Sequence, residues 1–349
     1  MRSVRSLAAA AAILMAAVAC GTTNNTSGGT SCAKTYKVGL VTDVGKLSDK
    51  SFNATSWLGV QDAQADKSLC VEGKAIESNQ PTDYAKNMQT FVDQGYDMVL
   101  AVGFLMGDDT LAVAKKNTKT KFAIVDYAYD PVKDAPPANI TGLVFKEDQA
   151  GFLIGALAGL MTKTNTVGQV LGLKIPPVQR YADGYIAGVK YTNAAAKVLT
   201  VYQGPGDGAA FNNPDWGKAR ATDEANQNAD IIFGGGGNTG NGALLGALAK
   251  NKTCIGVDTD QYISYPDAKG CLMTSAEKKL AVAVKTAIVD MVKNTWPSSN
   301  LLVFDAANGG VGISPYHDYD SKIPADVKAK ITDIQKKLAD GSLQTGVKV

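Results

Sequence analysis

The sequence predicts an α/β protein of two lobes, each built on a doubly wound parallel sheet. Apolar runs of strand length alternate with stretches of helix length, which is typical of βαβ units. This alternation occurs as two successive series along the chain. The roughly 320 residues that carry it exceed the size at which a single hydrophobic core stops growing, so we expect two lobes.

The N-terminus has the pattern of an export signal. Arg2 and Arg5 precede an apolar stretch over residues 7–19, and small residues lead to Cys20. This order is typical of a secretory signal peptide over residues 1–19. A cysteine directly after the cleavage point indicates a bacterial lipobox, so we expect Cys20 to be acylated and to anchor the protein at the extracytoplasmic face of the cell membrane. The alternative is an ordinary secreted protein in which this cysteine is free.

A polar segment follows the signal. Residues 21–31 contain no apolar side chain, a composition that favours a flexible tether. We therefore expect residues 20–34 to link the lipid anchor to the folded body.

The first series of elements follows this linker. Strands are predicted at Tyr36–Thr42, Glu72–Ser78, Met98–Val102 and Phe122–Asp126, and helices at Phe52–Ala65 and Thr82–Gln94. Ligands of open α/β sheets bind outside the carboxyl ends of the strands. Asp126 ends the fourth of these strands and is therefore a candidate for a binding site, with a helix or turn cap as the structural alternative.

Residues 41–53 carry the most informative candidate site. They follow the first predicted strand and open the first predicted helix, and they contain Asp43, Phe52 and Asn53. A carboxylate can accept hydrogen bonds from ring N–H groups or sugar hydroxyls, a phenyl ring can stack on a planar ring, and an amide can donate and accept. The alternative is structural, with Asp43 and Ser51 in a turn and helix cap and Phe52 in the core.

The second series has strands near Thr166–Leu171, Val198–Tyr202, Ile231–Phe233 and Cys254–Val257, and a helix at Val178–Ala196. A glycine-rich run over residues 234–242 follows its third strand. This run lacks the Gly-Lys-Ser/Thr ending of a Walker loop, so a phosphate site is not expected there. Its glycines instead allow the backbone to approach a ligand closely.

Four cysteines remain after Cys20, namely Cys32, Cys70, Cys254 and Cys271. An even number in an exported chain, without a Cys-x-x-Cys pair or a neighbouring histidine, favours disulfides over metal ligands. Three pairings are possible. We favour Cys32 with Cys70, which precede strands expected to be neighbours, and Cys254 with Cys271, which bracket a loop.

Charge and residue usage argue against several function classes. Once Arg2 and Arg5 leave with the signal, 33 of the 35 basic residues remain against 33 acidic ones. A nucleic-acid partner is therefore not expected, because phosphate binding needs a concentrated basic face. His317 is the only histidine, so no second histidine can complete a zinc site or a nucleophile-base pair. We expect no enzyme, cofactor or metal, although a glycosidase-like pair of carboxylates remains the catalytic alternative.

Several blocks of the sequence resemble one family. They lie at residues 41–53, 87–97, 103–108, 145–155, 236–242, 256–261 and 309–313. In order and spacing, these blocks resemble the BMP family of basic membrane lipoproteins, the PnrA-like substrate-binding proteins whose characterised members bind purine nucleosides for ABC importers. The resemblance covers nearly the whole chain after Cys32.

The resemblance implies a type I periplasmic-binding-protein fold, with its lobes joined by three crossovers. These crossovers are expected near Asn139–Lys146, Leu272–Lys278 and Asp305–Ser314. Lobe 1 would comprise residues 35–143 and 276–305, and lobe 2 would comprise residues 144–275 and 306–349.

The resemblance also implies a set of ligand-binding residues. Phe52 and Phe211 would stack on the two faces of a base, and the glycine-rich turn at Gly236 would approach the sugar. Asp258 would accept hydrogen bonds from ribose hydroxyls, and Lys278 would bind the ligand. The complete expected set is Asp43, Phe52, Asn53, Asp126, Phe211, Gly236, Asp258 and Lys278.

Two of these assignments have rivals nearby in the sequence. Trp216 could replace Phe211, although its place in the first turn of the next helix favours packing against the lobe. Lys279 adjoins Lys278, which leaves the register of the lysine open.

The expected function is therefore that of a monomeric, lipid-anchored solute-binding protein. It would bind a purine nucleoside between its lobes and present it to an ABC permease. The alternative is a receptor or sensor for a sugar or another small hydroxylated molecule, because an aromatic pair can also stack on a sugar.

Overall fold

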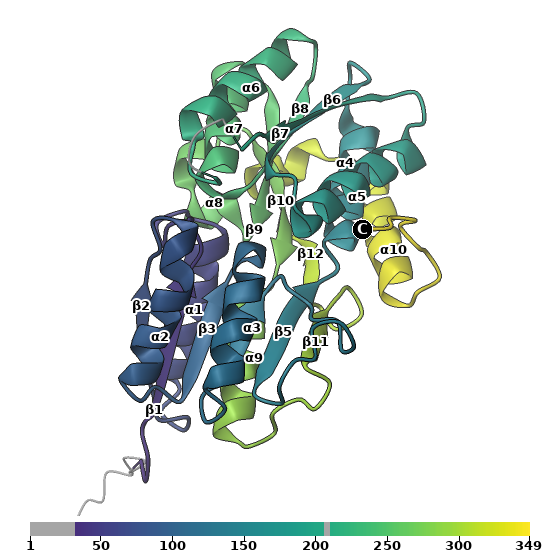
Figure 1. The fold of residues 1–349 in the computed structure, drawn as a ribbon. Helices are drawn as coiled ribbons and strands as arrows, with labels where there is room; N and C mark the ends of the chain where they lie inside the picture. The colour runs from purple at the N-terminus through teal and green to yellow at the C-terminus, as the bar shows by residue number, and fades with distance from the viewer. Residues whose placement is uncertain (1–31, 206–209) are drawn as a thin grey trace, which may run out of the picture.

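The fold is known from a computed structural model that describes residues 32–205 and 210–349. The expected signal peptide, the lipidation site Cys20 and residues 21–31 lie outside the described residues. Two six-stranded sheets form two lobes, one above the other in Figure 1. The predicted two-lobed α/β fold is therefore confirmed.

Lobe 1 is built on a fully parallel sheet with the strand order β11-β5-β4-β3-β1-β2. Its strands are β1 (Tyr36–Thr42), β2 (Val71–Ile76), β3 (Met98–Val102), β4 (Lys121–Val125), β5 (Ile140–Phe145) and β11 (Leu301–Phe304). Its helices are α1 (Phe52–Ala65), α2 (Tyr84–Asp93), α3 (Gly107–Lys116) and α9 (Leu280–Val292), with short 3-10 turns at Pro81–Asp83 and Phe104–Met106. Every residue of the central strand β3 is buried, as expected where helices cover both faces of a parallel sheet.

Lobe 2 has the strand order β12-β10-β9-β8-β6-β7. Its strands are β6 (Thr166–Leu173), β7 (Lys197–Gln203), β8 (Ile231–Gly235), β9 (Thr253–Asp258), β10 (Leu272–Lys278) and β12 (Val311–Ile313). Its helices are α4 (Glu147–Met161), α5 (Pro176–Thr192), α6 (Pro214–Asn226), α7 (Gly237–Ala249), α8 (Gln261–Ser264) and α10 (Ala325–Ala339), with 3-10 turns at Pro266–Ala268 and His317–Lys322. This sheet is parallel except at its edge, where β12 runs antiparallel to β10.

The chain passes between the lobes after β5, after β10 and after β11. In Figure 1 the yellow-green α9 and β11 lie among the purple and blue elements of lobe 1, which are far from them in sequence. The changes of sheet follow Phe145, Lys278 and Phe304. The expected lobe boundaries at 143 and 275 fall within β5 and β10, close to these points.

The late helix α9 belongs to lobe 1 because it packs closely on α1. A Cβ atom at Gly59 of α1 would lie 2.6 Å from the carbonyl oxygen of Ala281 in α9. Only glycine therefore allows the two helix backbones to approach this closely. This contact fixes the returning chain on the first lobe.

Most predicted elements are present, with differences at their ends. Strand β1 and helix α1 have the predicted bounds, whereas helix α5 ends at Thr192, four residues before the predicted Ala196. Strand β4 ends at Val125, so Asp126 follows the strand instead of ending it. Asp126 has φ of 72°, and this left-handed conformation stops the extended strand.

Both favoured disulfides are present. Cys32 is bonded to Cys70 beside β1 and β2, and Cys254 of β9 is bonded to Cys271, directly before β10. Within the described ranges, no helix is long and apolar enough to span a membrane.

Candidate ligand-binding cleft

A cleft lies between the two lobes at the carboxyl ends of their strands, and it encloses about 650 Å³ of space, part of it open to solvent. All eight of the predicted ligand-binding residues line it. Lobe 1 also contributes Gly45, Asp49, Gly103 and Phe104, and lobe 2 contributes Leu171, Ile175, Pro177, Val178, Tyr181, Phe233, Gly235, Gly237 and Val257. The structure therefore brings the whole predicted set together at one place.

Asp43 and Asn53 lie on the lobe 1 wall. The Oδ1 atom of Asp43 accepts a hydrogen bond from the Gly45 backbone N–H at 2.8 Å. Burial raises the pKa of Asp43 to about 7, so near neutral pH this carboxyl group occurs both as a donor and as an acceptor. The Oδ1 atom of Asn53 is buried and has no hydrogen-bond partner within the described protein. A ligand N–H or O–H would satisfy this acceptor.

Asp49 also lines the cleft, and sequence reasoning missed it. Its carboxylate accepts hydrogen bonds from the backbone N–H groups of Ser51, Asn53 and Ala54. Asp49 thus caps the start of α1, the helix that begins with Phe52. An aspartate shortly before a predicted helix is a recognisable capping signal, and it could have identified this residue.

The two phenylalanines come from opposite lobes. Phe52 is the first residue of α1, and Phe211 precedes α6 with φ of 57°. Two glycines of lobe 2 have no room for a Cβ atom. A Cβ atom at Gly172 would lie 2.3 Å from the Phe211 ring, and a Cβ atom at Gly236 would lie 2.6 Å from the backbone nitrogen of Gly172. These glycines therefore make room for the Phe211 ring at the cleft wall.

Trp216 does not take the place of Phe211. It lies in α6, packs against the core of lobe 2 and does not line the cleft. Its backbone N–H is held by the side chain of the helix cap Asn213.

Lys278 forms the centre of a buried ionic cluster. Its Nζ atom lies 2.8 Å from both carboxylate oxygens of Asp126 and 3.3 Å from Oε1 of Glu147. Glu147 is fully buried and also accepts a hydrogen bond from Nε of Arg180 at 2.6 Å. Sequence reasoning missed Glu147, although a glutamate opening the very apolar helix α4 was a signal that a buried partner is needed. Lys279, the rival lysine, pairs instead with Glu277 and is 41% exposed.

The ionic cluster joins the two lobes, because Asp126 follows β4 of lobe 1 whereas Lys278 ends β10 of lobe 2. Burial lowers the pKa of Lys278, but the neighbouring charges of Asp126 and Glu147 outweigh it and leave the pKa above its usual value. Burial raises the pKa of Asp126 to about 6 despite the lysine. At pH 7.5 the lysine is therefore charged. The Nζ atom also lies 5.0 Å from the centre of the Phe52 ring, within range of a cation–π interaction.

Asp258, the last residue of β9, lies on the lobe 2 wall in a left-handed conformation with φ of 67°. Aspartate tolerates this conformation better than most residues, and it turns the carboxylate away from the line of the strand. Its Oδ2 atom accepts a hydrogen bond from Oγ of Ser51, in the other lobe, at 2.6 Å. Burial raises the pKa of Asp258 to about 6.

The cleft is acidic and aromatic. Asp43, Asp49, Asp126 and Asp258 line it, against Lys278 as the cation of the lining, and this lysine is already paired. An anionic ligand would therefore meet like charge, whereas a neutral ligand with N–H or O–H donors would meet acceptors. Among the residues that the structure describes, no group of histidine, cysteine, aspartate or glutamate side chains is arranged to hold a metal ion.

Comparison with known proteins places this chain in a family. Residues 36–343 match the family described as ABC transporter substrate-binding protein PnrA-like. The chain is 31% identical to the CD4+ T-cell-stimulating antigen of Listeria innocua, with 93% of each chain covered. It is 30% identical to the ABC transporter nucleoside-binding protein BmpA of Lactococcus lactis, with 94% and 96% covered.

Solved structures agree on the fold. An ABC transporter solute-binding protein from Aeropyrum pernix K1 superposes with a TM-score of 0.76 at 24% identity, covering 88% of this chain and 92% of that one. The residues matched by the family model, 36–343, include both lobes. This chain therefore belongs to the PnrA-like family of ABC transporter substrate-binding proteins.

Proposed function

We propose that this protein binds a purine nucleoside in the interlobe cleft and presents it to an ABC permease without altering it. Membership of the family supports the general role, that of an extracytoplasmic solute-binding protein of an ABC transporter. The main support for a purine nucleoside as the ligand is the pair Phe52 and Phe211, which line one cleft from opposite lobes. A planar base between two phenyl rings gains stacking on both faces.

The polar groups of the cleft support a neutral ligand with several donors. Asp43, Asn53 and Asp126 on one wall and Asp258 on the other offer oxygen acceptors. Ring N–H groups and ribose hydroxyls are complementary donors. A nucleotide is a poorer candidate, because its phosphate would enter an acidic lining. The nucleoside-binding relative from Lactococcus lactis is consistent with this ligand class.

A panel of ligands tests the proposal. The protein should bind inosine, guanosine or adenosine more tightly than the free bases, D-ribose or the nucleoside monophosphates in calorimetry. Mass spectrometry of the natively purified protein should identify a co-purified nucleoside. Tight binding of ribose or another sugar, without any nucleoside binding, would favour the sugar receptor instead.

The Asp258→Ala variant should lose part of the preference for a nucleoside over its base. A hydrogen bond to a charged group contributes about 1.5 to 3 kcal/mol, so nucleoside affinity should fall by roughly 10- to 100-fold. Affinity for the free base should change less, because a base has no ribose hydroxyl. Asp267→Ala removes an exposed carboxylate from the same lobe and serves as the control. Equal losses for nucleoside and base would contradict the proposed role.

We also propose that acylated Cys20 anchors the protein to the membrane. The wild-type protein should partition into the detergent phase of a Triton X-114 extraction, and Cys20→Ser should appear in the aqueous phase or as an unprocessed precursor. One acyl chain gives only marginal membrane binding, so mass spectrometry should find more than one chain. A wild-type protein that is fully aqueous and free of lipid would refute the anchor.

A further inference from the structure

Hydrogen bonds between the lobes converge on residues 49–51, the end of the loop between β1 and α1, and three of them are 2.8 Å or shorter. The Nδ2 atom of Asn241 donates to the Asp49 carbonyl oxygen at 2.7 Å. The Oγ atom of Ser264 donates to the Lys50 carbonyl oxygen at 2.8 Å. The third bond, from Ser51 to Asp258, was described above. Consecutive residues of lobe 1 are thus bound from α7, α8 and β9 of lobe 2.

The donors of two of these bonds do not belong to the ligand site. Asn241 and Ser264 do not line the cleft, and they bind backbone carbonyl groups of the opposite lobe. These contacts exist only when the lobes are close together. Their free energy therefore favours closure by itself, without a contribution from a bound molecule.

The amide of Asn241 is oriented by its own lobe. Gln261 donates from Nε2 to Oδ1 of Asn241 at 2.8 Å, and its Oε1 atom accepts from the Val257 backbone N–H at 2.9 Å. Because Gln261 occupies the oxygen of the Asn241 amide, the NH₂ group is oriented as the donor. It donates to the Asp49 carbonyl of lobe 1 and, at 3.2 Å, to Oδ1 of Asn238 in its own lobe. A chain of hydrogen bonds thus connects β9, next to the cleft residue Asp258, with the Asp49 carbonyl.

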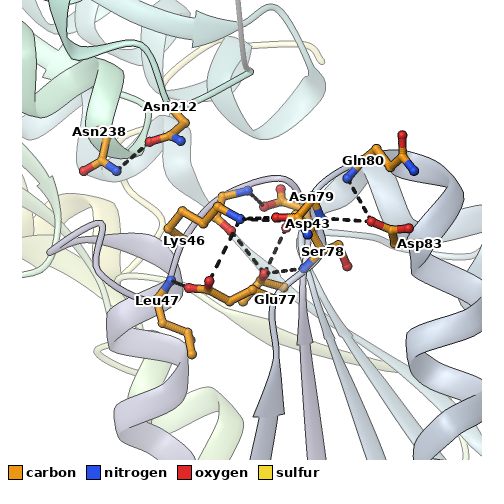
Figure 2. A network of polar contacts seen from close by, with 12 residues as sticks. Asp43, Lys46, Leu47, Glu77, Ser78, Asn79, Gln80, Asp83, Asn212 and Asn238 are labelled. Atoms are coloured by element: carbon orange, nitrogen blue, oxygen red, sulfur yellow. Dashed lines mark hydrogen bonds and ion pairs between the residues drawn. The ribbon is translucent and has the colours of Figure 1, made fainter.

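The accepting segment is held on lobe 1. The Asp49 carboxylate binds the first turn of α1, and Lys50 has a left-handed φ of 57°. The preceding loop is tied down as well, since Nζ of Lys46 bonds to Asn79 at 2.9 Å and the Leu47 backbone N–H bonds to Glu77 at 2.7 Å (Figure 2). The carbonyl groups of Asp49 and Lys50 are therefore presented in a fixed geometry, which lowers the entropic cost of closing on them.

We propose that Asn241 and Ser264, with Gln261 as the positioning residue for Asn241, form a latch that holds the two lobes closed. This inference goes beyond the proposed function, because it does not depend on which ligand the cleft accepts. A neutral hydrogen bond corresponds to roughly a 2- to 10-fold change in an equilibrium constant. The latch therefore sets the population of closed protein, and with it the apparent affinity of any ligand that binds the closed form.

Energy transfer between two fluorophores tests the latch in the absence of ligand. The labels are attached in the full chain to Lys86→Cys in α2 and Lys218→Cys in α6, two exposed positions on opposite lobes. The background is Cys20→Ser, since the remaining native cysteines are paired. Ser264→Ala should lower the closed-to-open ratio about 2- to 10-fold, and Ser264→Thr, which keeps the hydroxyl, should restore it.

Asn241→Asp should open the protein more strongly, by about tenfold or more, because it replaces the donor with a carboxylate that faces a carbonyl oxygen. Gln261→Ala should have an intermediate effect through the loss of orientation. Thr332→Ala removes a hydrogen bond within α10 and serves as the control, with no change expected. Circular dichroism checks that each variant is folded, and the half-buried Ser264 keeps the test valid if the buried Asn241 variant does not fold.

The outcomes separate the latch from the proposed function. An unchanged closed-to-open ratio in both Ser264→Ala and Asn241→Asp would overturn the latch. If both variants open the ligand-free protein but neither they nor the wild type bind inosine, guanosine or adenosine, the latch stands and the nucleoside proposal fails. If nucleosides bind, their dissociation rates should increase in both variants by the same factor by which the closed-to-open ratio falls.

Discussion

Replacing Lys278 with methionine should disfavour the closed form by about 3 to 5 kcal/mol, the usual cost of removing one partner from a buried ion pair. The lysine is 2% exposed, and its removal would leave the carboxylates of Asp126 and Glu147 facing each other without the cation between them. Glu147 would keep Arg180, but Asp126 would lose its charged partner. Because Asp126 belongs to the other lobe, the protein can relieve this repulsion by opening.

The neighbouring lysine provides a matched control. Lys279→Met removes the same type of side chain one residue later, but from a partly exposed pair with Glu277, which is expected to contribute no more than about 1 kcal/mol. The interlobe fluorophore pair reports closure in both variants, and urea unfolding reports global stability. We expect a large loss of closure and a smaller loss of global stability in Lys278→Met alone.

Acidic pH should partly rescue Lys278→Met. The pKa of Asp126 in the closed form is about 6, above its usual value of 3.8, chiefly because of burial. A raised pKa means that the closed form gains stability as the pH falls through that value. Loss of the lysine raises this pKa further, so the gain between pH 7.5 and pH 5 should be larger than in Lys279→Met. The control also carries the contribution of Asp43, whose pKa is raised chiefly by burial. The charge of Lys278 lowers the pKa of Asp258, so in Lys278→Met this pKa should rise together with that of Asp126 and add to the gain. If Lys278→Met and Lys279→Met have the same closed-to-open ratio at pH 7.5, the ion pair of Lys278 with Asp126 does not hold the lobes together.

Periodicity was sufficient to predict eight of the strands and the wall residues at their ends, whereas β5 and β10 occupy stretches that the resemblance implied as crossovers. Asp43 and Asp258 lie where β1 and β9 end, and position at a strand end is a property that periodicity reveals. The resemblance supplied Phe211 and Lys278, which no local pattern singles out. Their place depends on distant contacts, such as the space at Gly172 that admits the Phe211 ring.

Contacts between the lobes could not be predicted from the sequence. Asn241 lies 192 residues from Asp49, and Ser264 lies 214 residues from Lys50. Asn241 lies in the family-like block at residues 236–242, but that block does not indicate a partner for its side chain, and Ser264 lies in none of the blocks. Both donors bind backbone carbonyl groups, which every residue carries. Glu147 illustrates the same limit, because its partners Lys278 and Arg180 come from two other elements. Such pairings follow from how the lobes meet, which the local periodicity of a sequence does not reveal.

The aromatic pair should make the largest contribution to nucleoside affinity. Base stacking on an aromatic side chain contributes about 1 to 3 kcal/mol, so Phe52→Ala and Phe211→Ala should each weaken nucleoside binding by that amount. The double variant should lose about 2 to 6 kcal/mol if the two rings act independently on the base. Calorimetry with inosine and guanosine on the four proteins of this cycle measures both the losses and their coupling.

The two positions are not equivalent, and the difference separates stacking from other effects. The Phe52 ring lies 5.0 Å from Nζ of Lys278, so its loss also disturbs the ionic cluster. No cation–π contact is found for Phe211 in the described structure, which makes Phe211→Ala the cleaner measure of stacking.

Phe211→Leu keeps an apolar side chain but lacks the ring, so it should recover little affinity if the contact is stacking on a base. Trp216→Ala, in the same segment but outside the cleft, should leave affinity unchanged. Full recovery by leucine would reduce the role of Phe211 to apolar volume, and undiminished binding in the double variant would show that the base does not lie between the rings.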